Sequence, residues 1–148
     1  DMQSAMRVHS DSVRVQEAAC QVLVSVTADS QALVESVWGQ ELLGEIKLAM
    51  DTHTDSTNLH EQACMVLCNI TKLPEHTAEA GRQGVLQCLQ RSLRAHIASP
   101  AVQSQACRAL LNLTHDNEDN RATAAELQLL AEVKRAMRFH RVSAVVQE

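Results

Sequence analysis

The chain has 148 residues, of which 45% are hydrophobic, 21% charged and 1% aromatic, a composition that favours helix over sheet. The formal charge is −5, and the chain has neither the dense positive charge nor the stacking aromatics that phosphate backbones require, which excludes a nucleic-acid-binding protein. No apolar run approaches the roughly 18 residues of a membrane span, and no charged-then-apolar leader opens the chain, so we expect no membrane partner.

The five cysteines form an odd set without the spacing of a disulfide scaffold. Three of them, Cys20, Cys64 and Cys107, recur at one register within apolar patterns. We interpret all five as reduced core residues and expect an intracellular, cytoplasmic location.

In chain order, the first half predicts a cycle of helices. Residues 1–9 carry no starting cap and align with the ends of later helices, so the chain is expected to begin inside a repeat. A motif helix follows over residues 15–27, then a short helix ending near Gly39 and a longer one over residues 41–53. The cycle then returns to a second motif helix over residues 59–71.

The second half repeats this order. We expect a short helix to an Ala80-Gly81 turn, a second helix over residues 85–96 and a third motif helix from Pro100 to Thr114. A polar loop over residues 115–120 then precedes another helix pair. The last residues, 146–148, align with the start of a fourth motif helix.

Register markers confirm the period of the pattern. Four histidines are separated by 44, 43 and 44 residues, and each has a serine three places later: His9, His53, His96 and His140. We interpret these histidines as helix-end residues whose imidazoles bond the last carbonyls of their helices. The sequence thus predicts an all-α array with a 43–44-residue period: a partial repeat (1–28), two complete repeats (29–72 and 73–115) and a partial repeat (116–148).

A unit of this length that ends in a Val-Gln-x-x-Ala-Cys-x-x-Leu-x-Asn-Leu helix resembles the armadillo repeat. Residues 73–115 match best, through Ala80-Gly81, Val85-Leu86 and residues 106–113; Ser25 departs by replacing the motif asparagine. The resemblance implies three-helix repeats stacked in a right-handed α-solenoid, an armadillo-type superhelix, whose motif helices line a concave groove.

By the same analogy, residues at four-residue spacing along the motif helices would face that groove. Its asparagines would bind the backbone of an extended peptide. The tryptophan that precedes the asparagine by four residues in nuclear-import members is replaced here, which argues against recognition of basic signal peptides. The expected groove residues are Gln21, Ser25, Glu61, Met65, Asn69, Lys72, Ser104, Arg108, Asn112 and His115.

Two more specific interpretations, a metal site and a cysteine nucleophile, have less support. His60, Cys64 and Cys68 lie four apart on one helical stripe, but structural zinc needs a fourth ligand, and a cysteine nucleophile needs an orienting group. Because Cys68 is matched in the other copies by Val24 and Leu111, we assign that register position to packing and expect no metal and no cofactor. Asn69 and Asn112 begin glycosylation sequons but fall within predicted packed helices.

The sequence therefore predicts a non-catalytic scaffold, not an enzyme, that binds a protein or peptide partner through its groove. The alternative is an accessory or regulatory array of a larger enzyme, such as a kinase-like or ubiquitin-ligase protein. Both ends fall inside repeats, so end-to-end self-association through exposed terminal repeats is also expected.

Overall fold

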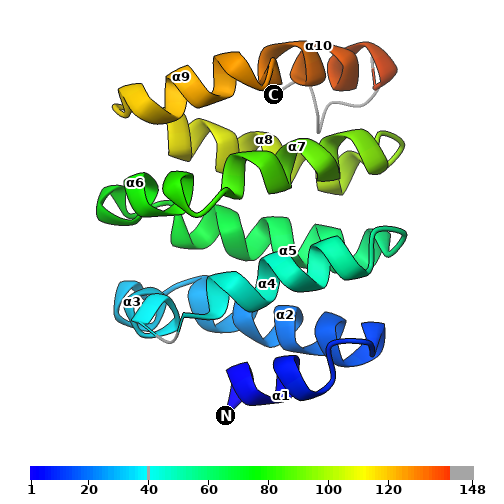
Figure 1. Cartoon of the computed structure of the whole chain (residues 1–148), viewed down its shortest axis with the longest axis vertical. Helices are drawn as coiled ribbons and strands as arrows, with labels where there is room; N and C mark the ends of the chain where they lie inside the picture. The colour runs from blue at the N-terminus through cyan, green and yellow to red at the C-terminus, as the bar shows by residue number, and fades with distance from the viewer. Residues whose placement is uncertain (40, 141–148) are drawn as a thin grey trace.

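The computed structural model describes residues 1–39 and 41–140, and within them the fold is all-α with no strand. The helices are stacked in chain order along the long axis of the molecule (Figure 1). Their bounds are α1 (Met2–Val8), α2 (Val13–Thr27), α3 (Gln31–Gly39), α4 (Leu42–Thr52), α5 (Thr57–Ile70), α6 (Pro74–Arg82), α7 (Val85–Ala95), α8 (Pro100–Thr114), α9 (Glu118–Glu126) and α10 (Leu129–Phe139).

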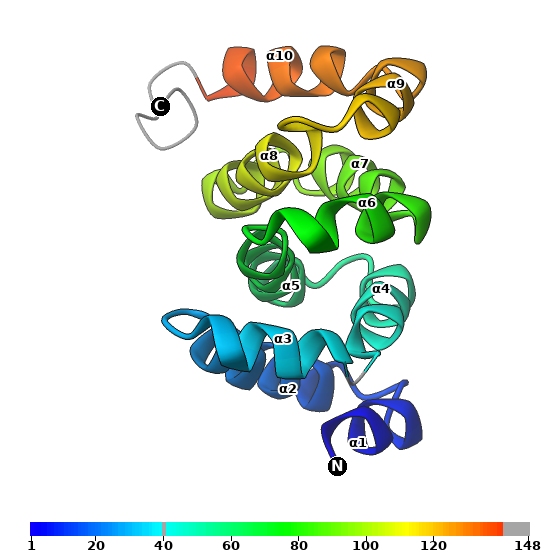
Figure 2. The ribbon, with the colours of Figure 1, turned by 90° about the vertical axis from the view of Figure 1, so that its left-hand side faces the viewer.

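The three motif helices α2, α5 and α8 lie one above the next on one side of the stack (Figure 2). On another side, α1, α4, α7 and α10 pack in sequence, each against the next. The structure is therefore a repeat-like helical fold. The expected fourth motif helix lies outside the described residues.

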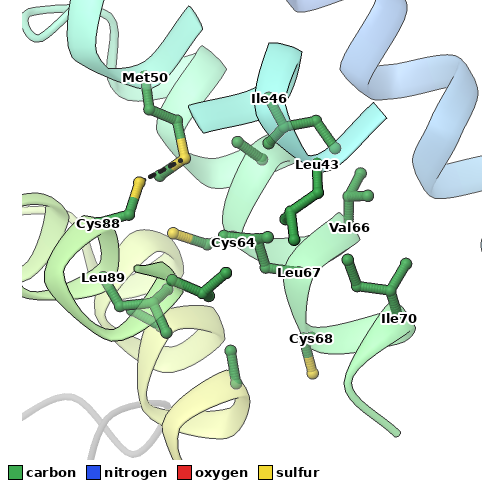
Figure 3. Close-up of a cluster of buried hydrophobic side chains, with 14 of the residues drawn as sticks. Leu43, Ile46, Met50, Cys64, Val66, Leu67, Cys68, Ile70, Cys88 and Leu89 are labelled. Carbon is green, nitrogen blue, oxygen red and sulfur yellow. Dashed lines mark hydrogen bonds between the residues drawn. The ribbon is translucent and has the colours of Figure 1, made fainter. Parts of the chain in front are cut away.

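One continuous apolar cluster joins these rows, from Met6 in α1 to Leu129 in α10. In its centre, Cys64 is directed toward Cys88 and Met50, whereas the Cys68 sulfur points away from them (Figure 3). The motif helices and the longer helices α4 and α7 bury apolar stripes against neighbouring copies, which is why no single unit could bury its apolar surface alone.

Helix boundaries follow local chemistry. The hydroxyls of Ser56 and Ser99 accept hydrogen bonds from the backbone N–H of Leu59 and Val102, and Pro100 occupies the first turn of α8. The expected absence of a cap at the start of the chain is wrong, because the Asp1 carboxylate accepts from the Ser4 N–H at 2.7 Å.

Two further expectations about the second half are corrected. The polar loop is shorter than predicted, since Asn117 caps the Asn120 N–H and α9 begins at Glu118. Gly81 lies inside α6 rather than at a turn, and a Cβ there would lie 1.8 Å from Oδ1 of Asn120. That glycine is required by the close approach of α9, not by backbone conformation.

Buried polar side chains at the start of each motif helix connect it to the end of the preceding helix. Nε2 of Gln16 donates to the carbonyls of Met6 and His9, both at 2.8 Å. Gln103 repeats this arrangement in α8, and His60 takes the position in α5. These bonds satisfy carbonyls that a helix end leaves without partners.

The four periodic histidines do end their helices, and the backbone N–H of each bonds the carbonyl four residues earlier. Where their imidazoles bond a backbone carbonyl, it belongs to the preceding copy: Nε2 of His53 donates to the Ser10 carbonyl at 2.8 Å, and Nε2 of His140 to that of Ile97. The expectation that the rings bond the carbonyls of their own helices is therefore wrong for His53 and His140. Their rings tie successive copies together.

Candidate functional site: the surface of the motif helices

The three motif helices share a hollow of about 470 Å³. Residues from α2, α5 and α8 all contribute to it, so it spans all three copies of the motif. Its lining consists of Val24, Ala28, Met65, Cys68, Asn69, Lys72, Gln105, Arg108, Leu111 and Asn112.

A second hollow of about 520 Å³ lies at the C-terminal ends of α5 and α8. Lys72, Leu111 and Asn112 line both hollows, so together they form one continuous surface that we call the groove. The second hollow extends the groove to Pro74 and Ala78 on α6 and to the turn after α8.

The two groove asparagines that lie on motif helices, Asn69 and Asn112, bind the motif helix of the preceding copy. Nδ2 of Asn69 donates to Oγ1 of Thr27 in α2 at 3.1 Å. Nδ2 of Asn112 donates to the Cys68 carbonyl at 3.0 Å and lies 3.4 Å from Oγ1 of Thr71. Each asparagine thus uses its donor inside the protein, as a tether to the preceding copy.

Two cations stand beside these asparagines. Nζ of Lys72 donates to Oδ1 of Asn69 at 3.1 Å, and Arg108 is exposed at the rim of the first hollow. No carboxylate of the described residues forms an ion pair with either cation. Both cations favour the thiolate of Cys68, but burial dominates and raises the pKa of that thiol.

Six of the ten expected groove residues line the two hollows: Met65, Asn69, Lys72, Arg108, Asn112 and His115. The other four do not. Gln21 and Ser25 are exposed on α2, and Glu61 and Ser104 are half-buried nearer the starts of α5 and α8.

Sequence reasoning missed a large exposed apolar side chain of the groove. Leu111 was assigned to packing, but it is 67% exposed, while Cys68 at the same register is 6% exposed. The assignment to packing is therefore correct for Cys68 and wrong for Leu111. The register of Leu111 could not indicate its exposure, because the residues at this position are apolar in all three copies.

The His60 and Cys64 pair has a different chemistry from that of a nucleophile and base. Nε2 of His60 donates to the Met50 carbonyl at 3.1 Å, and Nδ1 accepts from Oγ of Ser92 at 2.8 Å, so both ring nitrogens are occupied. Burial raises the pKa of the Cys64 thiol well above its usual range. Burial, followed by the nearby His96, lowers the pKa of His60 to about 4.

The same region joins His60 to the next copy. The rings of His60 and His96 lie with their centroids 4.3 Å apart, and Nδ1 of His96 is 3.2 Å from Oγ1 of Thr57. Burial lowers the pKa of His96 as well. Two neutral imidazoles are therefore packed together at the interface between α5 and α7.

The Trp38 ring packs between helices. It stacks on the imidazole of His76 at 4.3 Å with an angle of 6° between the planes. Nδ1 of His76 in turn donates to the Ile70 carbonyl at the end of α5. The contact fixes α3 against the start of α6.

No protein-family model, curated protein or solved structure matches the chain. Within residues 1–39 and 41–140, no cluster of three or more His, Cys, Asp or Glu side chains has the arrangement of a metal site. None of the described helices has both the length and the apolar character needed to cross a membrane.

Proposed function

We propose that the chain is an armadillo-type segment that binds a protein partner through the groove. In this proposal, the stacked units form a right-handed α-solenoid with α2, α5 and α8 on its concave side, and binding requires no catalysis and no cofactor. The 43–44-residue register and the order of short, long and motif helices support it.

One observation carries the proposal: two adjoining hollows on the motif helices meet at an exposed leucine. Leu111 lies between cations and amides that can orient a ligand, while its own side chain offers apolar area for burial. A concave surface with an apolar centre and a few polar groups is typical of a binding site.

Replacing the groove asparagines would be a poor test of this proposal. Their Nδ2 groups tether α5 to α2 and α8 to α5, so an alanine at either position would loosen the stack as well as alter the groove. A clean test needs a residue that faces the groove without holding the fold.

Leu111 meets this requirement, and Leu130 is its matched control. The two leucines are 67% and 66% exposed, and Leu130 lies on α10, outside both hollows. A photo-crosslinking amino acid at position 111 would first identify the partner in cell extract. Calorimetric titration would then compare Leu111→Ser with Leu130→Ser.

We expect Leu111→Ser to weaken partner binding by about tenfold or more, because a leucine buried on binding contributes about 1.5–3 kcal/mol. Leu130→Ser should leave the affinity unchanged, and circular dichroism should show the same helix content in both variants. Equal affinity of wild type and Leu111→Ser would refute the groove as the binding surface. Weakening by Leu130→Ser alone would place the interface at the end of the stack.

A further inference from the structure

The remaining hydrogen-bonding capacity of Asn112 restricts what the groove can bind. An amide nitrogen has two N–H donors, and both lie toward the preceding helix, near the Cys68 carbonyl and Oγ1 of Thr71. Asn112 lines both hollows, and within the described chain no donor is bound to its Oδ1. Asn112 therefore offers a ligand an acceptor and no donor.

Asn69 has less hydrogen-bonding capacity left for a ligand than Asn112 has. Its nitrogen donates to Thr27, and its oxygen accepts from Nζ of Lys72. An ammonium has three donors, so Lys72 keeps capacity for a ligand after this bond. The polar groups that Asn112 and the two cations leave to a ligand near Cys68 are thus one amide acceptor and the positive charges of Lys72 and Arg108.

The two cations line the first hollow together with Cys68. Lys72 follows the end of α5, Arg108 lies on α8, and both favour the thiolate of Cys68. Neither has a carboxylate partner among the residues described. A ligand carboxylate placed above Cys68 would meet both positive charges.

The apolar surface adjoins this charged position. Leu111 borders both hollows, and the second continues along Pro74 and Ala78. A side chain that leaves the cations toward α6 meets the apolar atoms of Pro74 and Ala78, while His115 and Asp116 line the same hollow at the turn after α8.

We propose that the groove binds an extended peptide segment in which an acidic residue adjoins an aliphatic one. The acidic carboxylate binds Lys72 and Arg108, a backbone N–H donates to Oδ1 of Asn112, and the aliphatic side chain packs on Leu111. This assignment rests on the proposed function and names the chemistry of its ligand.

The test is a selection from a random-peptide library displayed on phage, with the folded chain as bait. Parallel selections use Lys72→Glu and Arg108→Glu, with Lys134→Glu on α10 as the matched charge reversal outside the groove. Lys72→Gln and Arg108→Gln provide milder variants that remove the charge but keep a polar side chain, and circular dichroism checks the fold of each.

The wild-type chain and Lys134→Glu should enrich peptides with Asp or Glu next to Leu, Ile or Val. Replacing the peptide carboxylate by an amide should weaken binding by about tenfold, because two charge-assisted contacts are lost. The groove variants should lose the acidic preference, and raised salt should weaken wild-type binding.

The outcomes separate the two proposals. Enriched peptides without an acidic preference, or with the same preference in all variants, would overturn the acidic–aliphatic assignment and leave peptide binding intact. A folded chain that enriches no peptide would overturn the assignment and the extended-peptide form of the proposed function together. Enriched peptides that bind equally well to Leu111→Ser would place the site outside the groove.

Discussion

Residues 29–72 and residues 73–115 are two copies of one pattern, with helices in the same order, yet they differ where the pattern meets its neighbours. At the start of the motif helix, the first copy has His60 where the second has Gln103. Near its end, Cys68 is buried and Leu111 is exposed. A shared register therefore fixes the position of a side chain but not its chemistry or its exposure.

The first of these differences sets how each interface responds to protons. Nε2 of Gln103 donates to the carbonyls of Leu93 and His96, and an amide does not titrate. His60 donates to the Met50 carbonyl with a group that can be protonated, and it packs against His96. The α5 interface is therefore sensitive to acid in a way that the α8 interface is not.

Acid should destabilise the chain through His60, and this is the largest effect we expect. The pKa of His60 is lowered from 6.5 to about 4 by folding, so the stability that its neutral form provides is present above pH 6.5 and is lost as the pH falls toward 4. At about 1.4 kcal/mol for each unit of pKa, His60 alone contributes about 3 kcal/mol to that loss. Urea unfolding followed by circular dichroism between pH 7 and pH 4 would measure it.

The variant His60→Gln should remove this part of the pH dependence, because Gln103 and Gln16 show that an amide fits the same position. His115→Gln is the control, since His115 is exposed on the surface. The lowered pKa of His96 would leave a smaller loss of stability in the same direction. If the wild type and His60→Gln lose the same stability on acidification, His60 is not the sensitive group.

The second difference predicts unequal costs for the same truncation. Cys68→Ala removes a buried thiol that Asn112 of the next motif helix covers, and should cost about 1 kcal/mol of unfolding free energy. Leu111→Ala removes a larger side chain but should cost less than about 0.5 kcal/mol, because that side chain is exposed. Urea midpoints of the two variants measure the contrast, and a larger loss for Leu111→Ala would show that Leu111 is packed in solution.

The helices and their order could be predicted because apolar spacing and caps are local properties of the chain. Leu111 could not be placed correctly, because its burial depends on whether another helix covers it. The register predicts that Asn69 and Asn112 lie in the groove. It does not predict the groups to which their Nδ2 atoms donate, because Thr27 and Cys68 belong to a preceding copy. Contacts between copies decide what a repeated residue offers a ligand.

Backbone conformation before the second helix of each unit was also beyond sequence reasoning. Three residues in equivalent positions, Glu41, Gly84 and Gln128, have positive φ angles of 55°, 81° and 54°, and only one of them is glycine. A left-handed conformation strains a residue that carries a Cβ and is readily adopted by glycine. The first copy thus holds a strained residue where the second does not.

The smallest effect we expect comes from exchanging the residue types at these two positions, which should stabilise one copy and destabilise the other. Glu41→Gly should raise the unfolding free energy by about 0.5–1 kcal/mol, because relief of strain exceeds the added entropy of the unfolded chain. Gly84→Ala should lower it by a similar amount; an added Cβ would meet only Oε1 of Gln87 at 3.5 Å and Nζ of Lys47 at 3.8 Å, so the cost comes from the backbone. Glu41→Ala removes the carboxylate without changing the strain. If it stabilises the chain as much as Glu41→Gly does, the charge of Glu41, rather than its conformation, is the source of the difference between the copies.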